Sequence, residues 1–206
     1  FILINTRFSH ANPIRGFRDK FGTNSPISKN FSLKHLSQLT KENSILQHEF
    51  IEMIFFLLDK KPNLDIVIRP HPSENIEIYK VFFKNSKVYI SDSGPIDSWI
   101  RMCKVLIHNG CTTAIQGYIS EKKIISYEPL SCENLAGPKL TNQLSNIVST
   151  KESLLEEIEN IGNLKKNDHW KSTISVLDSI NKIYDLVEQN FNKYKNNKIS
   201  IFLMRI

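Results

Sequence analysis

Short apolar runs alternate with helical patterns along the first 130 residues of this 206-residue chain. Runs rich in Ile, Val and Tyr, each with the length of a strand, lie at 1–5, 64–70, 87–91, 104–108 and 123–128. Helical patterns lie between them at 44–60, 75–84, 95–102 and 111–120. A parallel strand is buried on both faces and needs a helical crossover to the next strand. The alternation therefore predicts an α/β fold with a doubly wound parallel sheet.

The pattern changes towards both ends of the chain. Residues 6–43 are polar and predict a long loop with a short helix near 33–40, so that the helix over 44–60 begins at Ser44 as its N-cap. From Thr150 onwards only helical patterns occur. We expect a Rossmann-like domain at 1–149 and a C-terminal helical extension at 150–206 that packs on it. Because the chain starts with Phe1 inside a strand, we also expect a missing N-terminal domain.

Composition excludes several classes of protein. The formal charge of +6 comes from scattered lysines rather than from a basic cluster with aromatic residues, which argues against a nucleic-acid partner. Cys103, Cys111 and Cys132 have neither an even count nor metal-ligand spacing, so neither disulfides nor a metal site is expected. No apolar run reaches the ~20 residues that span a bilayer. These features favour a cytoplasmic protein.

Polar side chains follow three of the predicted strands. In open α/β sheets, ligands bind outside the carboxyl ends of the strands. The groups at these ends are Asn5, Thr6 and Arg7 after the first strand, Arg69 and His71 after the second, and His108, Asn109 and Gly110 after the fourth. The sequence thus predicts a ligand site at one edge of the sheet.

The segment "LIHNGCTTAIQGY", residues 106–118, has the pattern of a phosphate-binding turn. Gly110 allows a tight turn, and Thr112 and Thr113 would lie in the first turn of the next helix, whose free N–H groups favour an anion. The alternative is a plain strand-to-helix turn with a threonine cap.

The segment "RPHP", residues 69–72, ends the second strand. Its prolines restrict the backbone, so Arg69 and His71 would be held in a fixed geometry. Arginine can bind a phosphate through two N–H groups, and histidine can donate to a phosphate oxygen. The alternative is that the prolines only end the strand and both side chains face water.

Taken together, "VIRPHPSEN" and "SDSGPIDSWIRMCKVLIHNGCTTAIQGYISEKKIISYEP" resemble the carboxy-terminal donor-binding domain of GT-B glycosyltransferases that build bacterial surface polysaccharides such as capsule and lipopolysaccharide. The resemblance covers about residues 1–130. It is nearest to proteins with a His-Pro motif, which they share with transferases that use CMP-activated sugars.

The resemblance implies a role for each matching residue. His71 and Pro72 would contact the nucleotide phosphate, with His71 assisting departure of the nucleotide. A phosphate would be held at the turn of Asn109, Gly110, Cys111, Thr112 and Thr113. Gln116 stands where the family often has a ribose-binding Glu, which puts nucleotide affinity in question. Glu128, after the fifth strand, would contact sugar hydroxyls or face water.

The function expected from this resemblance is transfer of a sugar from a nucleotide-sugar, CMP-linked in preference, to a surface glycan or lipid-linked acceptor. No cofactor is implied, because the nucleotide-sugar is a substrate, and peripheral contact with the inner membrane face is compatible with such an acceptor. Alternatives are a CDP-glycerol-type polyol phosphate transferase, a UDP-sugar 2-epimerase and a non-catalytic nucleotide-binding or scaffold module. This segment alone is expected to be inactive.

Overall fold

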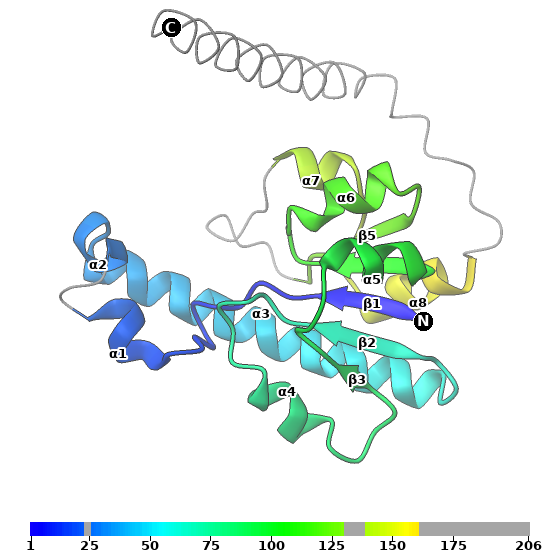
Figure 1. Cartoon of the computed structure of the whole chain (residues 1–206), viewed down its shortest axis with the longest axis horizontal. Helices are drawn as coiled ribbons and strands as arrows, with labels where there is room; N and C mark the ends of the chain where they lie inside the picture. The colour runs from blue at the N-terminus through cyan, green and yellow to red at the C-terminus, as the bar shows by residue number, and fades with distance from the viewer. Residues whose placement is uncertain (23–25, 130–138, 161–206) are drawn as a thin grey trace, which may run out of the picture. The chain divides into compact units, whose positions relative to one another are not determined.

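Six parallel strands form the centre of the structure, a computed structural model that describes residues 1–22, 26–129 and 139–160 (Figure 1). The strands are β1 (Ile2–Asn5), β2 (Ile66–Arg69), β3 (Tyr89–Ile90), β4 (Val105–His108), β5 (Lys123–Tyr127) and β6 (Asn146–Val148). Their order in the sheet is β3-β2-β1-β4-β5-β6, and every neighbouring pair is parallel. This is the strand order of Rossmann-like folds.

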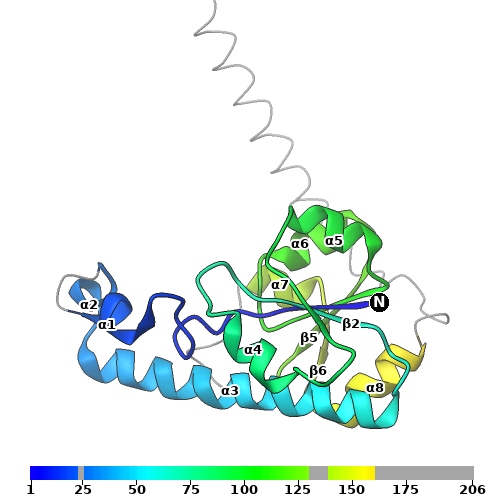
Figure 2. The ribbon, with the colours of Figure 1, turned by 60° about the horizontal axis from the view of Figure 1, so that its bottom comes forward.

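Helices cover both faces of the sheet (Figures 1 and 2). They are α1 (Gly16–Phe21), α2 (Pro26–Asn30), α3 (Leu33–Lys60), α4 (Glu77–Phe82), α5 (Ile96–Met102), α6 (Thr113–Ile119), α7 (Lys139–Gln143) and α8 (Lys151–Glu159). The side chains of α3, α4 and α8 share one apolar core with one face of the sheet. Those of α5 and α6 share a second core with the other face.

Alternate residues of each strand face opposite cores, as the two-residue period of a strand requires. Ile2 and Ile4 of β1 join the core of α3, whereas Leu3 joins the core of α5 and α6. Phe8 and Tyr127 each pack edge-on against Phe50 of α3, with ring centroids 5.1 and 5.3 Å apart. Burial on both faces explains why the strands are apolar throughout, and the predicted α/β class with a parallel sheet is confirmed.

The predicted start of the long helix is wrong. That helix, α3, begins at Leu33 rather than after Ser44, and its N-cap is Ser32, whose hydroxyl accepts a hydrogen bond from the His35 N–H at 3.2 Å. Ser44 lies inside the helix and donates to the Thr40 carbonyl oxygen at 2.9 Å. The apolar period missed the first turns because the buried face there carries polar residues, namely Glu42, Asn43 and Gln47.

The region expected to be an irregular loop also contains α1 and α2. At the other end, the sequence did not predict β6, a strand of three residues whose Ile147 is exposed. The helical pattern that starts at Thr150 is α8, with Thr150 as its N-cap and Ser153 as the capping partner.

The helix α8 belongs to the compact unit Phe1–Leu164. It is tied to the sheet by Lys123 of β5, which forms an ion pair with Glu157. The helices predicted beyond it lie outside the described residues, so the predicted boundary at 149 and 150 stays a prediction. Among the described helices, none is long and apolar enough to cross a bilayer.

The N-cap assignment can be tested with two serines of the same helix. Ser32→Ala should lower the free energy of unfolding by about 1 kcal/mol, because it removes the acceptor for the His35 N–H. Ser44→Ala should be neutral or slightly stabilising, since alanine is the better helix former in a helix interior. Urea unfolding followed by circular dichroism measures both, and equal losses would contradict the assigned start of α3.

Candidate functional site

The carboxyl ends of β1 and β4 lie side by side at the centre of the sheet, where Asn5 pairs with His108. The strand order reverses between these two strands, because β2 and β3 follow on one side of them and β5 and β6 on the other. The chain leaves β1 towards α3 on one face of the sheet and leaves β4 towards α6 on the other, and the switch point between these two connections is called the crevice below. Ligands of open α/β sheets bind at this position.

Glu74 organises the chain around the ends of β1 and β2. Its carboxylate is only 2% exposed. Oε1 accepts from the backbone N–H groups of Phe8 at 2.9 Å and His71 at 3.2 Å. Oε2 accepts from the hydroxyl groups of Tyr79 at 2.6 Å and Thr6 at 3.0 Å. One side chain thus joins the connection after β1, the "RPHP" turn and α4.

The buried position of Glu74 disfavours the charged form of its carboxyl group. Burial raises the pKa of its carboxyl above the usual value, and the hydrogen bonds from Tyr79, Phe8, Thr6 and His71 lower it in part. The carboxylate also raises the pKa of Tyr79, second to the effect of burial. The sequence analysis passed over Glu74 although it stands in "RPHPSEN". The signal was a carboxylate three residues after His71, close enough to bond back to the turn.

His71 is exposed and presents a defined nitrogen. Its Nδ1 accepts from the Ser73 N–H at 3.2 Å and lies 2.7 Å from the Ser73 hydroxyl, so the proton of the neutral ring is on Nε2. Burial, then the charges of Lys20 and Arg7, lower the pKa of this imidazole. At neutral pH, His71 is therefore an uncharged donor through Nε2, a geometry that suits a hydrogen bond to a phosphate oxygen.

Arg69 makes contacts that the sequence analysis did not predict. Its guanidinium donates to the carbonyl oxygens of Ser93 at 2.7 Å and Gly94 at 2.6 Å. Burial lowers the pKa of this group, and the nearby Asp92 opposes that shift. Both hydrogen bonds of the guanidinium thus go to the loop after β3, and Arg69 holds that loop in position.

His108 occupies the turn that was predicted to cradle phosphate. Its fully buried ring accepts the Gly110 N–H at 2.9 Å and the Cys111 N–H at 3.2 Å through Nδ1, while Nε2 bonds the Ser145 hydroxyl at 2.8 Å. Burial, then Arg7, lower its pKa to about 4, so it stays neutral. His108 therefore supports the turn, and the described part of the chain offers hydrogen-bond partners to neither the Thr112 N–H nor the Thr113 N–H.

Two amide oxygens at this edge have no donor. The Asn5 side chain donates through Nδ2 to the Thr113 hydroxyl at 3.0 Å, but its Oδ1 is buried without a partner among the described residues. Asn109 Oδ1 is likewise buried without a hydrogen-bond partner among the described residues. A buried acceptor without a hydrogen bond costs stability. Because both oxygens are closed to solvent, a ligand that brings N–H or O–H groups would reach them after a local movement of the neighbouring side chains.

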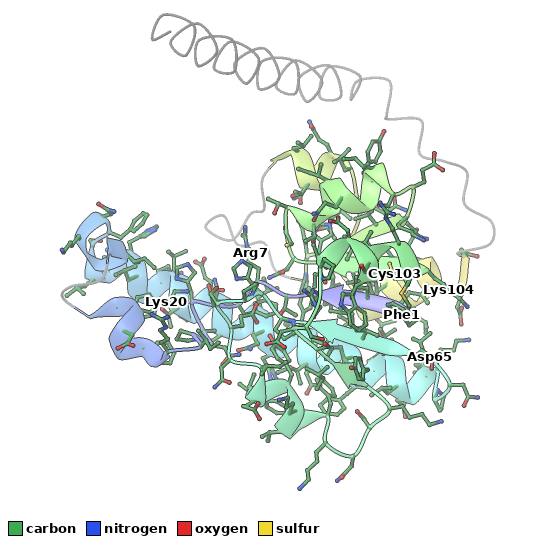
Figure 3. The ribbon with its side chains drawn as sticks, viewed as in Figure 1. Phe1, Arg7, Lys20, Asp65, Cys103 and Lys104 are labelled. Atoms are coloured by element: carbon green, nitrogen blue, oxygen red, sulfur yellow. The ribbon has the colours of Figure 1, made fainter. Side chains whose placement is uncertain are left out.

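The surroundings of the crevice are positive. Arg7, beyond the end of β1, acts on three histidines, because in each of His10, His71 and His108 its charge adds to the effect of burial and lowers the pKa. Lys20 acts in the same direction on His10 and His71, and its Nζ donates to the Ser9 carbonyl oxygen at 2.6 Å. Figure 3 shows Arg7 and Lys20 on the side of the sheet towards which β1 points. An anion in this place would meet cations and neutral donors.

The other predicted residues have the following places. Thr6 is buried against Glu74, and Pro72 is exposed in the "RPHP" turn. Gly110 has a φ of 74°, which supports the tight turn that was expected. Gln116 is half-buried on α6, and Glu128, after β5, accepts from the Ser126 hydroxyl at 2.9 Å. No contact among the described residues joins the side chain of Gln116 or Glu128 to the crevice, so their roles stay predictions.

Within the described ranges, no three His, Cys, Asp or Glu side chains gather in a way that could hold a metal ion. No model of a known protein family matches the chain, and no curated protein is significantly similar to it. The geometry and the residues themselves therefore carry the functional argument.

Two variants of Glu74 separate its shape from its charge. Glu74→Ala should lower the free energy of unfolding by about 3 kcal/mol, because the Phe8 and His71 N–H groups lose their acceptor. Glu74→Gln should cost less than about 1 kcal/mol, since the amide oxygen can replace Oε1 and the Tyr79 and Thr6 hydroxyls can turn to accept from its NH₂ group.

The stability of the wild type should depend on pH in a way that the stability of Glu74→Gln does not, because the pKa of Glu74 is raised in the folded protein. The folded state binds this proton more tightly than the unfolded state, so the linked stabilisation is complete below the unfolded pKa and is lost as pH rises through the folded pKa. The stability of the wild type should therefore fall relative to Glu74→Gln across that range. Urea unfolding at a series of pH values measures the difference, and a difference that moves in the opposite direction would contradict the raised pKa.

Proposed function

We propose that this chain is the donor-binding half of a glycosyltransferase of the GT-B type, which takes a sugar from a nucleotide-sugar for a bacterial surface polysaccharide. The observation that carries the proposal is the carboxyl edge of β1, β2 and β4, which carries positive charge, the neutral His71 and two amide oxygens without partners among the described residues. A ligand that satisfies all of them has an anionic group and several N–H or O–H groups. A nucleotide-sugar has both.

The phosphate of the donor would lie near His71 and Arg7. The Nε2–H of His71 would donate to a phosphate oxygen, and the charge of Arg7 would lower the cost of bringing the anion there. The N–H groups of Thr112 and Thr113 would add donors, while those of Gly110 and Cys111 stay with His108. As the nucleotide departs, its phosphate gains negative charge, and His71 would stabilise that charge more strongly than in the ground state.

The hydroxyl groups of the ligand would bind to the amide oxygens of Asn5 and Asn109. The oxygen of Asn5 is held in place by the bond from its own Nδ2 to the Thr113 hydroxyl. A hydroxyl or amino group that donates to such an oxygen removes the cost of a buried unpaired acceptor. This cost makes the crevice selective for ligands that carry donors over simple phosphate.

The preference for a CMP-linked donor rests on the resemblance of "RPHP" and "HNGCTT" to the transferases with a His-Pro motif. In such enzymes the acceptor, a glycan or a lipid-linked sugar, binds to a second domain. The proposal therefore assigns nucleotide binding to the 206-residue chain and transfer to the enzyme that includes the acceptor domain. Arg69 would act through the loop after β3 rather than on the phosphate itself.

Calorimetric titration of the chain with CMP, CDP and UDP tests the binding role. We expect saturable binding with CMP the tightest, and a loss of about tenfold in CMP affinity for His71→Ala, the scale of one hydrogen bond to a charged group. His48→Ala is the matched control, because His48 is an exposed histidine of α3 outside the crevice, and its affinity should not change.

Other outcomes of the titration decide between the alternatives. Tightest binding of CDP would favour a polyol phosphate transferase, and tightest binding of UDP an epimerase. If none of the three nucleotides binds saturably while the chain is folded, the proposal fails and a non-catalytic scaffold remains.

Gln116→Glu tests the position that the family often uses for ribose. If Gln116 contacts a ribose hydroxyl, a carboxylate there should tighten CMP binding by about 1 kcal/mol, because a charged acceptor makes the stronger hydrogen bond. Titration of the same nucleotide measures the change. Unchanged or weaker affinity would show that Gln116 does not contact ribose.

A further inference from the structure

The α1–α2 arm, residues 14–22 and 26–34, consists of α1, α2 and the first turn of α3. Figures 1 and 2 show it at the end of α3 that extends beyond the sheet, on the side towards which β1 points. The crevice contacts described above use residues before and after this arm, with the exception of the electrostatic effect of Lys20. The proposed nucleotide site therefore does not account for the side chains that this arm exposes.

Large apolar side chains are exposed on this arm. Among the described residues, twelve large hydrophobic side chains are exposed, and four of them are Ile14, Phe17, Phe31 and Leu33. Leu33 is 78% exposed and Phe17 51%. Single exposed apolar residues are common on a protein surface, but a group of them in a short segment marks a surface that contacts something less polar than water.

The same segment is strongly basic. Residues 14–34 contain five cations, Arg15, Arg18, Lys20, Lys29 and Lys34, against one acid, Asp19, which gives a net charge of +4. The side chains of Arg15, Lys29 and Lys34 are exposed. The arm thus presents two phenylalanines and two aliphatic residues within a field of positive charge.

We propose that the α1–α2 arm docks on an anionic phospholipid surface. Aromatic and aliphatic side chains enter the boundary between headgroups and acyl chains, while lysine and arginine stay at the charged headgroups. Positive charge alone would suit an acidic protein equally well. The exposed phenylalanines and Leu33 favour the bilayer, because an acidic protein surface offers little apolar area to cover them.

The proposal goes beyond nucleotide binding and does not depend on it. The arm would hold the carboxyl edge of the sheet beside the membrane, so that a donor bound in the crevice would lie next to a lipid-anchored acceptor. No described helix can span the bilayer, so attachment by this arm is peripheral.

Co-sedimentation of the full 206-residue chain with vesicles tests the proposal. We expect binding to vesicles of equimolar phosphatidylcholine and phosphatidylglycerol, and little binding to phosphatidylcholine alone. Arg15→Gln/Lys29→Gln/Lys34→Gln should weaken binding to the anionic vesicles at least about tenfold at low salt, since each basic residue near such a surface contributes about fivefold. Phe17→Ser/Phe31→Ser should weaken it by a similar factor and should remove the part that persists at high salt.

Matched controls use side chains elsewhere that are also exposed. Lys84→Gln/Lys87→Gln/Lys104→Gln removes the same charge, and Val81→Ser/Met102→Ser removes exposed apolar groups away from the arm. Circular dichroism confirms that each variant is folded. The proposal is overturned if the controls weaken binding as much as the arm variants, or if the two vesicle types bind equally. It is also overturned if Phe17→Ser/Phe31→Ser abolishes self-association in sedimentation velocity and leaves vesicle binding unchanged.

Discussion

A single buried carboxylate holds the carboxyl edge of this sheet together. Glu74 accepts hydrogen bonds from the backbone of two connections and from two hydroxyl groups, so the chain after β1 and the "RPHP" turn have one common anchor. Removing this charge from water is costly, and the raised pKa of Glu74 records that cost. The hydrogen bonds offset it, and the geometry of His71 depends on them because its own N–H is one of the donors.

Two cations, Lys20 and Arg7, act on His71, and the buried carboxylate of Glu74 acts in turn on Lys20, where it opposes the lowering of the pKa by burial. Desolvation lowers the pKa of His71 most, and the charges of Lys20 and Arg7 lower it further, since each disfavours a further proton on the ring. An anion bound there would reverse this effect and raise the pKa of His71. Binding of a phosphate and uptake of a proton by His71 would therefore be linked. His71, a neutral donor in the free protein, would then become a charged donor once the anion is bound.

The two proposed surfaces of the chain are connected through α3. This helix begins next to the exposed residues of the α1–α2 arm and then passes under the sheet, where Gln47 donates to the Tyr79 hydroxyl at 3.2 Å and so contacts the hydrogen-bond network of Glu74. The same helix thus supports a basic, apolar outer segment and the inner side of the crevice.

The sequence by itself determined the class of fold and the edge of the sheet that carries polar groups. Strands such as Ile2–Asn5 are buried on both faces, so their composition alone marks them, and the polar residues that follow them must lie at the carboxyl ends. Tertiary structure decided what these polar groups contact. Arg69 binds the loop after β3 and His108 supports its own turn, because their partners are carbonyl oxygens and N–H groups, which every residue carries and which no residue pattern distinguishes. For the same reason the first turns of α3 could not be predicted, since a polar residue counts as exposed until the fold supplies the partners that make its burial favourable. The spacing of Glu74 from His71 could indicate a bond back to the turn, but its bonds to Phe8, Thr6 and Tyr79 depend on the fold.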